Sequence, residues 1–212
     1  MYIPKHNEET RIDVIDRLIR SHPLATLVTM GASGLFATHL PMVLYREGEQ
    51  AILRGHISRA NRQWREFTPE VEALAIFSGP EHYITPNWYP EKAVTGKVVP
   101  TWNYAVVHAY GTMRVMDDEA WLRTQIGDLT RSNEAARATP WAVTDAPKPF
   151  VDAMVRGIIG LEIEIARIEG KWKVSQNRPA EDRAGVAAGL RRGDDPMQRA
   201  MAELVDRARR QE

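Results

Sequence analysis

The run GHISRANRQW, residues 55–64, holds the side chains best suited to bind a small anion. Ser58 supplies a hydroxyl, Arg59 and Arg62 supply guanidinium groups, and a helix beginning at Ser58 would add free backbone N–H groups. A phosphate dianion needs several N–H donors together with arginine or lysine. The same residues also suit a solvated basic face on a short helix capped by Ser58. Their spacing alone leaves both interpretations open.

A second polar group lies in VPTWNYAVVHAYG, residues 99–111, which has the composition of a core strand. Strand alternation puts Thr101 and Asn103 on one face and Trp102, Tyr104 and His108 on the other. Hydrogen-bonding groups on both faces of a buried strand are costly unless they meet partners. A planar heteroaromatic ligand would supply such partners. A tryptophan and tyrosine layer at a subunit interface explains the aromatic residues but explains Asn103 less well.

The sequence lacks the common catalytic, nucleotide-binding and metal-binding motifs. It has no cysteine, and its six histidines are scattered without an H-E-x-x-H motif. No G-x-S-x-G, Walker or G-x-G-x-x-G motif occurs. We therefore expect no metal site, and we expect any chemistry to depend on a bound cofactor.

The composition describes an ordinary globular chain of 212 residues, 43% hydrophobic and 26% charged. The 28 basic residues balance the 28 acidic ones, so the chain lacks the excess positive charge that dominates nucleic-acid affinity. The N-terminal residues 1–11 are polar, and no apolar run is long enough to span a membrane. We expect a cytoplasmic protein without membrane contact.

The periodicity of the first half indicates helix, then antiparallel strands. Residues 8–21 form an amphipathic pattern that His22-Pro23 ends. The runs 24–30, 35–46 and 51–57 are strand-like and joined by glycine-bearing turns, and a helix at 58–67 precedes another strand.

The second half alternates one long loop with strands and helices. Residues 82–100 hold four prolines and the aromatic side chains of Tyr83, Trp88 and Tyr89, which predicts a long ordered loop. A strand at 101–116 and two helices follow. Residues 161–177 read as a hairpin with its turn at Glu169-Gly170. The pattern predicts a mostly β fold with peripheral helices, built as an antiparallel barrel.

The tail after Asn177 changes composition, with eight basic and seven acidic side chains on helical stretches. We therefore expect one domain at 1–177 and a helical C-terminal extension at 178–212. The tail arginines, among them Arg191, Arg207, Arg209 and Arg210, suit a solvated helical surface or a dimer arm better than a DNA reader. No helix-turn-helix stands out.

Six motifs together resemble one known family. MYIPKHN, THLPMVL, RGHISRANRQW, IFSGPEHYITPNWY, GKVVPTWNYAVVHAYG and IEGKWKVSQNR are similar to the PaiB family of FMN-binding transcriptional regulators. The resemblance runs from residue 1 to about residue 190. VPTWNY followed by GKWKxSQNR is its most specific part.

The resemblance implies an antiparallel split β-barrel, a homodimer and FMN bound at the subunit interface. The implied cofactor residues fall into three groups. The phosphate group would be held by Arg54, Gly55, His56, Ser58, Arg59 and Asn61. The backbone of Thr38, His39 and Leu40 would run along the isoalloxazine ring, and Trp102, Asn103, Gln176 and Asn177 would close the ring edge, some of them from the other subunit.

The family also implies negative transcriptional regulation, although a shared fold is a weak guide to function and DNA binding has little support in these residues. One alternative is a flavin-dependent oxidoreductase that uses NAD(P)H. In that case the 82–100 loop would be a lid and His56 or His108 a proton donor. The other alternative is a haem-binding split barrel with a histidine ligand.

Overall fold

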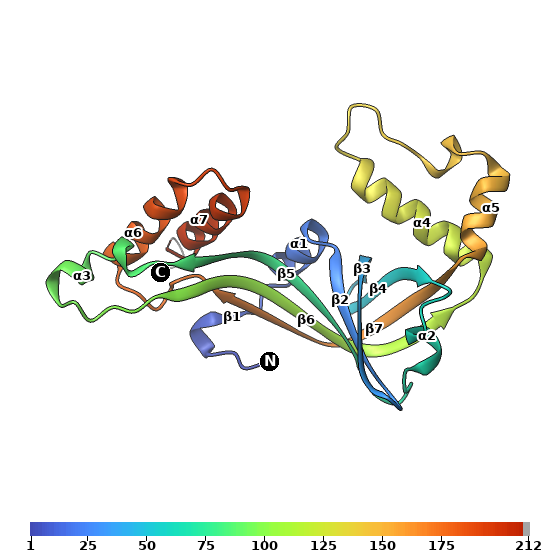
Figure 1. Ribbon diagram of the computed structural model, residues 1–212, viewed down its shortest axis with the longest axis horizontal. Coiled ribbons are helices and arrows are strands. Elements are labelled where there is room, and N and C mark those ends of the chain that lie inside the picture. Colours follow the sequence, from blue (N-terminus) through green and yellow to red (C-terminus); the bar gives the residue numbers. More distant parts are fainter. Residues whose placement is uncertain (210–212) are drawn as a thin grey trace. The chain divides into compact units, whose positions relative to one another are not determined.

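The computed structural model describes residues 1–209. Residues 210–212, which include Arg210 of the basic tail, lie outside the described part. Within it the chain forms seven strands (Figure 1). They are β1 (Glu8–Glu9), β2 (Leu24–Gly31), β3 (Gly34–Glu47), β4 (Gln50–Ser58), β5 (Ala73–Ile84), β6 (Thr101–Met116) and β7 (Ile158–Lys173).

The strands join in the order β1-β7-β4-β3-β2-β5-β6, and an additional pairing of β6 with β7 closes a ring of six strands. The pairings of β2 with β3 and of β3 with β4 are antiparallel, as are those of β4 with β7 and β2 with β5. Gly34 and Gly48 have positive φ at the two tight turns that flank β3. The prediction of an antiparallel split β-barrel with peripheral helices is confirmed.

Helices connect or follow the strands. They are α1 (Ile12–Ser21), α2 (Gln63–Glu66), α3 (Glu91–Val94), α4 (Glu119–Glu134), α5 (Lys148–Arg156), α6 (Ala180–Arg191) and α7 (Pro196–Arg209), with short 3-10 turns η1 (Lys5–Asn7), η2 (Pro86–Trp88) and η3 (Val143–Asp145). In the described residues, no helix has the length and apolar character needed to cross a bilayer.

The chain divides into two compact units, each assembled from separate segments. The first unit holds Met1–Leu18, Ser78–Val107 and the described residues from Glu169 onward. The second holds Ile19–Phe77 and His108–Ile168. The boundary that we expected after Asn177 stays a prediction.

The second unit has its core inside the strands. Leu27, Leu53, Phe77 and Ile163 are fully buried, and they alternate with residues that face outward. On the outer side lie α4 and α5 (Figure 1). These helices share an apolar cluster of Leu122, Val151 and Val155, with Trp121 packed against it. The indole of Trp121 lies over Gly160 of β7, where a Cβ atom would come within 2.3 Å of the ring. Gly160 therefore gives α4 its close approach to the sheet.

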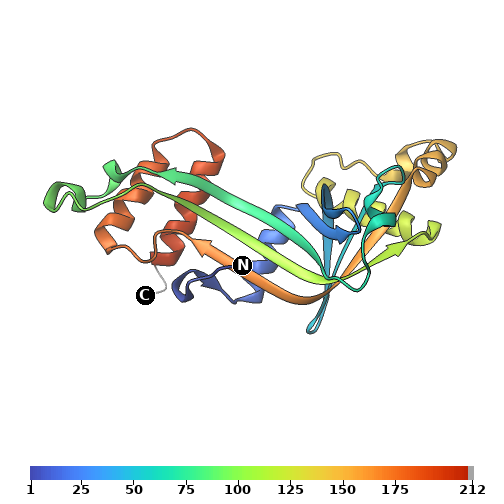
Figure 2. The ribbon, with the colours of Figure 1, turned by 60° about the horizontal axis from the view of Figure 1, so that its bottom comes forward.

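The first unit contains α6 and α7, which pack side by side (Figure 2). Trp88 of η2 rests on two glycines of α6. A Cβ atom at Gly185 would lie 2.0 Å from the Trp88 carbonyl oxygen, and one at Gly189 would lie 2.3 Å from the indole. Tyr89 is buried next to it. The middle of the expected 82–100 loop is therefore tied to α6.

The predicted hairpin at 161–177 is wrong, because β7 runs without a turn from Ile158 to Lys173. Gly170 pairs with Glu9 of β1, and a Cβ atom there would lie 2.7 Å from the Glu9 carbonyl oxygen. Gly170 thus permits a close approach between two strands. A tight hairpin turn at a Glu-Gly pair needs a glycine with positive φ. Gly170 does not have positive φ, which agrees with its place inside a continuous strand.

The predicted helix at 58–67 is also shorter than expected, since α2 covers only Gln63–Glu66. Ser58 is the last residue of β4, and its Oγ accepts from the Ala60 N–H at 3.3 Å. Asn61 Oδ1 instead accepts from the Gln63 N–H at 2.9 Å. The residues between β4 and α2 form a turn that side chains stabilise.

Candidate functional site

A pocket of about 440 Å³ lies in the second unit, where β3 and β4 meet the end of α5 and the start of β7. This volume falls within the range of small-molecule sites. Met154, Gly157 and Ile158 contribute its apolar side. Among the lining residues are six to which the family resemblance gives a cofactor role: Thr38, His39, Leu40, His56, Ser58 and Asn61.

Asn61 joins two walls of the pocket. Its Nδ2 donates to Thr38 Oγ1 of β3 at 3.0 Å, while its Oδ1 fixes the turn that leads to α2. Buried Gln63, the next residue but one, joins the same turn to β2. Its Nε2 donates to the Leu27 carbonyl at 3.3 Å and to Thr29 Oγ1 at 3.1 Å. Ser58 Oγ accepts from the backbone, so its O–H proton is available to donate to a ligand.

His56 is oriented by a residue of α4. Its Nδ1 lies 2.7 Å from Oε1 of Gln125, whose side chain is buried. With the Gln125 amide in this orientation, Oε1 accepts from a protonated Nδ1, and the neutral ring then offers Nε2 as an acceptor. In the part of the chain that the structure describes, Gln125 Nε2 and Trp121 Nε1 are buried without a hydrogen-bond partner.

Arg59 stands beside the pocket but does not line it. Its Nη1 and Nη2 donate to the two carboxylate oxygens of Asp117 at 2.9 and 2.5 Å, and its Nε donates to the Arg156 carbonyl at 3.0 Å. Its backbone N–H donates to the carbonyl of Gly157, a lining residue, at 2.9 Å. Hydrogen bonding from Arg59 lowers the pKa of Asp117 below its ordinary value.

Arg54 and Gly55 likewise lie outside the lining. Arg54 Nε donates to Glu162 at 2.8 Å, and its guanidinium lies over the rings of Tyr45 and Trp121. Gly55 faces the core, where a Cβ atom would come within 3.0 Å of Leu40 and of the Pro41 carbonyl oxygen. The missing side chain at Gly55 therefore allows Leu40 and Pro41 of β3 to pack closely against β4.

The other four expected cofactor residues belong to the first unit. Asn103 is fully buried and donates to Ser175 Oγ at 2.9 Å, and Ser175 has a positive φ of 65°. Trp102 is partly exposed and donates to Glu81 at 2.9 Å. Asn177 is exposed. These contacts show that Asn103 joins the two most specific sequence motifs to each other.

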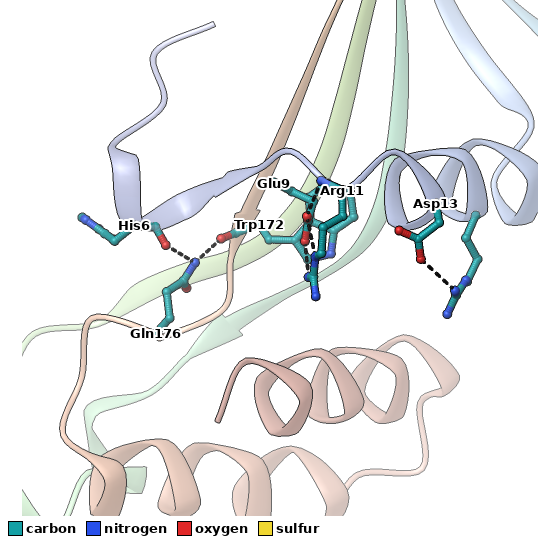
Figure 3. Close-up of polar contacts among 7 residues, drawn as sticks. His6, Glu9, Arg11, Asp13, Trp172 and Gln176 are labelled. Atoms are coloured by element: carbon teal, nitrogen blue, oxygen red, sulfur yellow. Dashed lines mark hydrogen bonds and ion pairs between the residues drawn. The ribbon is translucent and has the colours of Figure 1, made fainter. Parts of the chain in front are cut away.

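Gln176 fastens the N-terminal segment (Figure 3). Its Nε2 donates to the His6 carbonyl at 2.8 Å and to the Trp172 carbonyl, and its Oε1 accepts from the Val174 N–H at 2.7 Å. Figure 3 also shows the neighbouring pair of Glu9 and Arg11. The amide of Gln176 is thus engaged within the first unit. A cofactor role for it and for Trp102, Asn103 and Asn177 stays a prediction, as does the lid function of residues 82–100.

Sequence reasoning missed three partners of the expected cofactor residues: Gln125 on His56, Asp117 on Arg59 and Tyr45 on Arg54. Asp117 and Asp118 precede α4 together, and only Asp118 caps it, accepting from the Trp121 N–H at 2.7 Å. One cap is enough for a helix, so the second aspartate was a usable signal. Gln125 and Tyr45 carried no such signal in their spacing. Among residues 1–209, no cluster of histidine and carboxylate side chains could hold a metal ion.

The barrel places the chain in a recognised structural class. The flavocytochrome Anf3 from Azotobacter vinelandii has a similar fold, with a TM-score of 0.55 at 14% identity, over 81% of this chain and 72% of that one. The class is the split β-barrel.

The sequence comparisons narrow the class to a family. A family model described as "Putative FMN-binding domain" matches residues 1–167. The chain is 30% identical over 206 residues to the Protease synthase and sporulation protein PAI 2 of Bacillus subtilis, covering 97% of each. It is 34% identical over an alignment of 241 positions to an uncharacterized protein of Emericella nidulans, covering 97% of this chain and 96% of the relative. The chain belongs to the PaiB family, as the resemblance of its motifs predicted.

Proposed function

We propose that this protein binds FMN in the pocket of the second unit. The observation that carries the proposal is the convergence of Thr38, His39, Leu40, His56, Ser58 and Asn61, from two strands and a turn, on one pocket of suitable volume. The match of residues 1–167 to an FMN-binding family model supports the same cofactor.

The donor set fits a flavin nucleotide. The Ser58 hydroxyl and the Asn61 amide would meet the phosphate, while Leu40, Met154 and Ile158 offer apolar surface to the ring system. Bound FMN would supply redox chemistry of one or two electrons. The residues of the pocket bind and orient it, and His56, held by Gln125, presents an acceptor nitrogen.

The test is a titration of the purified protein with FMN, followed by flavin absorbance and fluorescence. We expect binding at micromolar FMN, and we expect Ser58→Ala and Asn61→Ala each to weaken it about tenfold, since each removes a donor worth about 1.4 kcal/mol. Ser132→Ala, an exposed serine on α4, is the matched control and should leave affinity unchanged. Absence of binding by the unaltered chain would refute the proposal.

Haem is the second candidate ligand, because His39 and His56 both line the pocket and histidine is a common axial ligand of haem iron. The structural relative Anf3 is itself described as a flavocytochrome. A haem-loaded protein would show an intense Soret band that is lost in one of His39→Ala and His56→Ala. A flavin spectrum without such a band favours FMN.

We further propose that the protein acts as a cytoplasmic homodimeric regulator. The name of the Bacillus subtilis relative, which refers to protease synthesis and sporulation, supports a regulatory role. Phe150 and Met154 of α5 are more than half exposed beside the pocket, which supports a subunit interface there. Sedimentation should give a dimer, and Phe150→Ser should weaken it.

Regulation and oxidoreduction differ in their readouts. A regulator should bind a promoter fragment with an affinity that falls steeply with salt. A reductase should lose its flavin colour when NADH or NADPH is added. An oxidised flavin after addition of either nucleotide favours the regulator, and equally weak binding to any DNA counts against it.

A further inference from the structure

Next to the proposed FMN site lies Arg59, whose guanidinium group already has hydrogen-bond partners within the protein. Arg59 lies between two lining residues: it follows Ser58 in the chain, and its backbone N–H donates to the carbonyl of Gly157. All three of its guanidinium nitrogens donate within the protein, two of them to Asp117. Its charge is therefore paired with a carboxylate outside the pocket.

The pocket itself holds no lysine or arginine among its lining residues in the described chain. A phosphate dianion there would meet only neutral donors and imidazoles. Arginine binds carboxylate and phosphate with the same planar fork of N–H groups. Asp117 thus occupies the donors that Arg59, the next residue after Ser58, would otherwise have for a phosphate.

The ion pair is built so that it can exchange partners. The Asp117 side chain is 56% exposed, and exposed ion pairs contribute little to stability. Asp117 has no part in capping α4, because Asp118 does this. The Arg59 side chain stays anchored through its Nε on the Arg156 carbonyl. The carboxylate could leave without loss of the helix or of the arginine's position.

We propose that Asp117 is a specificity-determining residue of the flavin site, which competes with the ligand's phosphate for Arg59. Asp117 holds the guanidinium fork in the structure, and a phosphate group that uses the same donors must displace it. The competition lowers affinity for phosphate-bearing flavins and leaves affinity for riboflavin, which has no phosphate, unchanged. This inference depends on the proposed function, because it assumes that the pocket receives a flavin.

The experiment compares FMN with riboflavin in fluorescence titrations of four proteins: the unaltered chain, Asp117→Asn, Arg59→Ala and the double variant. We expect Asp117→Asn to raise FMN affinity about tenfold and to leave riboflavin affinity unchanged. Arg59→Ala should weaken FMN alone. In the Arg59→Ala background, Asp117→Asn should have no effect on FMN.

Two controls separate this effect from others. Glu49→Gln removes the same charge in the exposed β3–β4 turn and should change FMN affinity little, since general electrostatics is all that it alters. Riboflavin affinity reports whether the pocket of each variant remains folded. The inference is overturned if Asp117→Asn weakens FMN, leaves it unchanged, or shifts both flavins equally. If the unaltered chain binds neither flavin, the proposed function itself fails.

Discussion

The Tyr45 hydroxyl and the Asp128 carboxylate share a hydrogen bond that contributes to a pKa shift in both residues. The Tyr45 hydroxyl donates to Asp128 Oδ2 at 2.5 Å. Burial, together with this bond, raises the pKa of Tyr45 to about 12. The same bond, assisted by Arg131, lowers the pKa of Asp128 below its ordinary value of 3.8. The pair links β3 to α4, the helix that also orients His56.

Tyr45→Phe should cost stability in a pH-dependent way. A carboxylate whose pKa is lowered by folding stabilises the protein above its unfolded pKa, and this stabilisation is lost as pH falls through the folded value. We expect a loss of about 1 kcal/mol in the free energy of unfolding at pH 7, after allowance for solvent screening. Urea unfolding at pH 7 and pH 3 measures it. A loss of equal size at both pH values would contradict this origin.

Around the pocket, the sequence predicted site residues that lie together in one run. It could not predict which residues from distant segments contact them. Ser58 carried a signal because its hydroxyl stands close to two arginines, whereas Asn61 was assigned through the family resemblance alone. Gln125 gave none, because only the folded chain brings α4 to β4. The interpretation of Arg59 as a phosphate ligand could not include Asp117, which is 58 residues away in the sequence.

Among the elements, α6 depends on glycine for packing. Gly185 and Gly189 are one helical turn apart and together seat Trp88, as their distances to it show. Glycine usually weakens a helix, because it adds flexibility to the unfolded chain. Here the missing side chains allow η2 to lie directly on the helix.

Gly189→Ala and Gly127→Ala should therefore act in opposite directions. A Cβ atom at Gly189 would overlap the Trp88 indole, so we expect a loss of about 1–3 kcal/mol. Gly127 of α4 has no atom within 4 Å of its ideal Cβ position, so alanine there should add about 0.5–1 kcal/mol. Denaturant unfolding of both variants measures this contrast. If both substitutions stabilised the protein, the Trp88 indole would have to move aside without loss of folding free energy.

The strands could be predicted from strand-like composition, and the turns only partly. The runs that became β2, β3 and β4 are rich in strand-forming residues and are joined by glycine-bearing turns, so their extents were close to correct. The end of β7 was mistaken for a hairpin, because Gly170 looks the same in sequence whether it turns the chain or admits a neighbouring strand.

At the scale of the whole molecule, no single stretch of sequence makes either compact unit. The first unit joins three segments and the second joins two, and β5, β6 and β7 contribute residues to both. The composition change after Asn177 suggested a boundary there. Composition could not show that Trp88 packs on α6, which follows this point in the chain.

Removal of residues 178–212 should therefore loosen the first unit. The shortened chain would expose Trp88 and Tyr89 and would remove Asp182, whose carboxylate accepts from the Glu91 N–H at 3.2 Å. We expect amide hydrogen exchange to accelerate in residues 78–107 far more than in β2, β3 and β4. Exchange measured by mass spectrometry compares the two regions. Unchanged exchange throughout would show that residues 1–177 fold as a self-sufficient domain.

The bond from Gln176 to the His6 carbonyl joins residues 170 positions apart. The ribosome adds about 5–20 residues per second, so Gln176 is synthesised on the order of ten seconds or more after His6. During that time the N-terminal segment lacks this hydrogen-bond partner. The β2–β3–β4 meander can pair much earlier, because its contacts are local. The polar composition of residues 1–11 suits that delay, since a nascent segment with little apolar surface is poorly recognised by other unfolded chains.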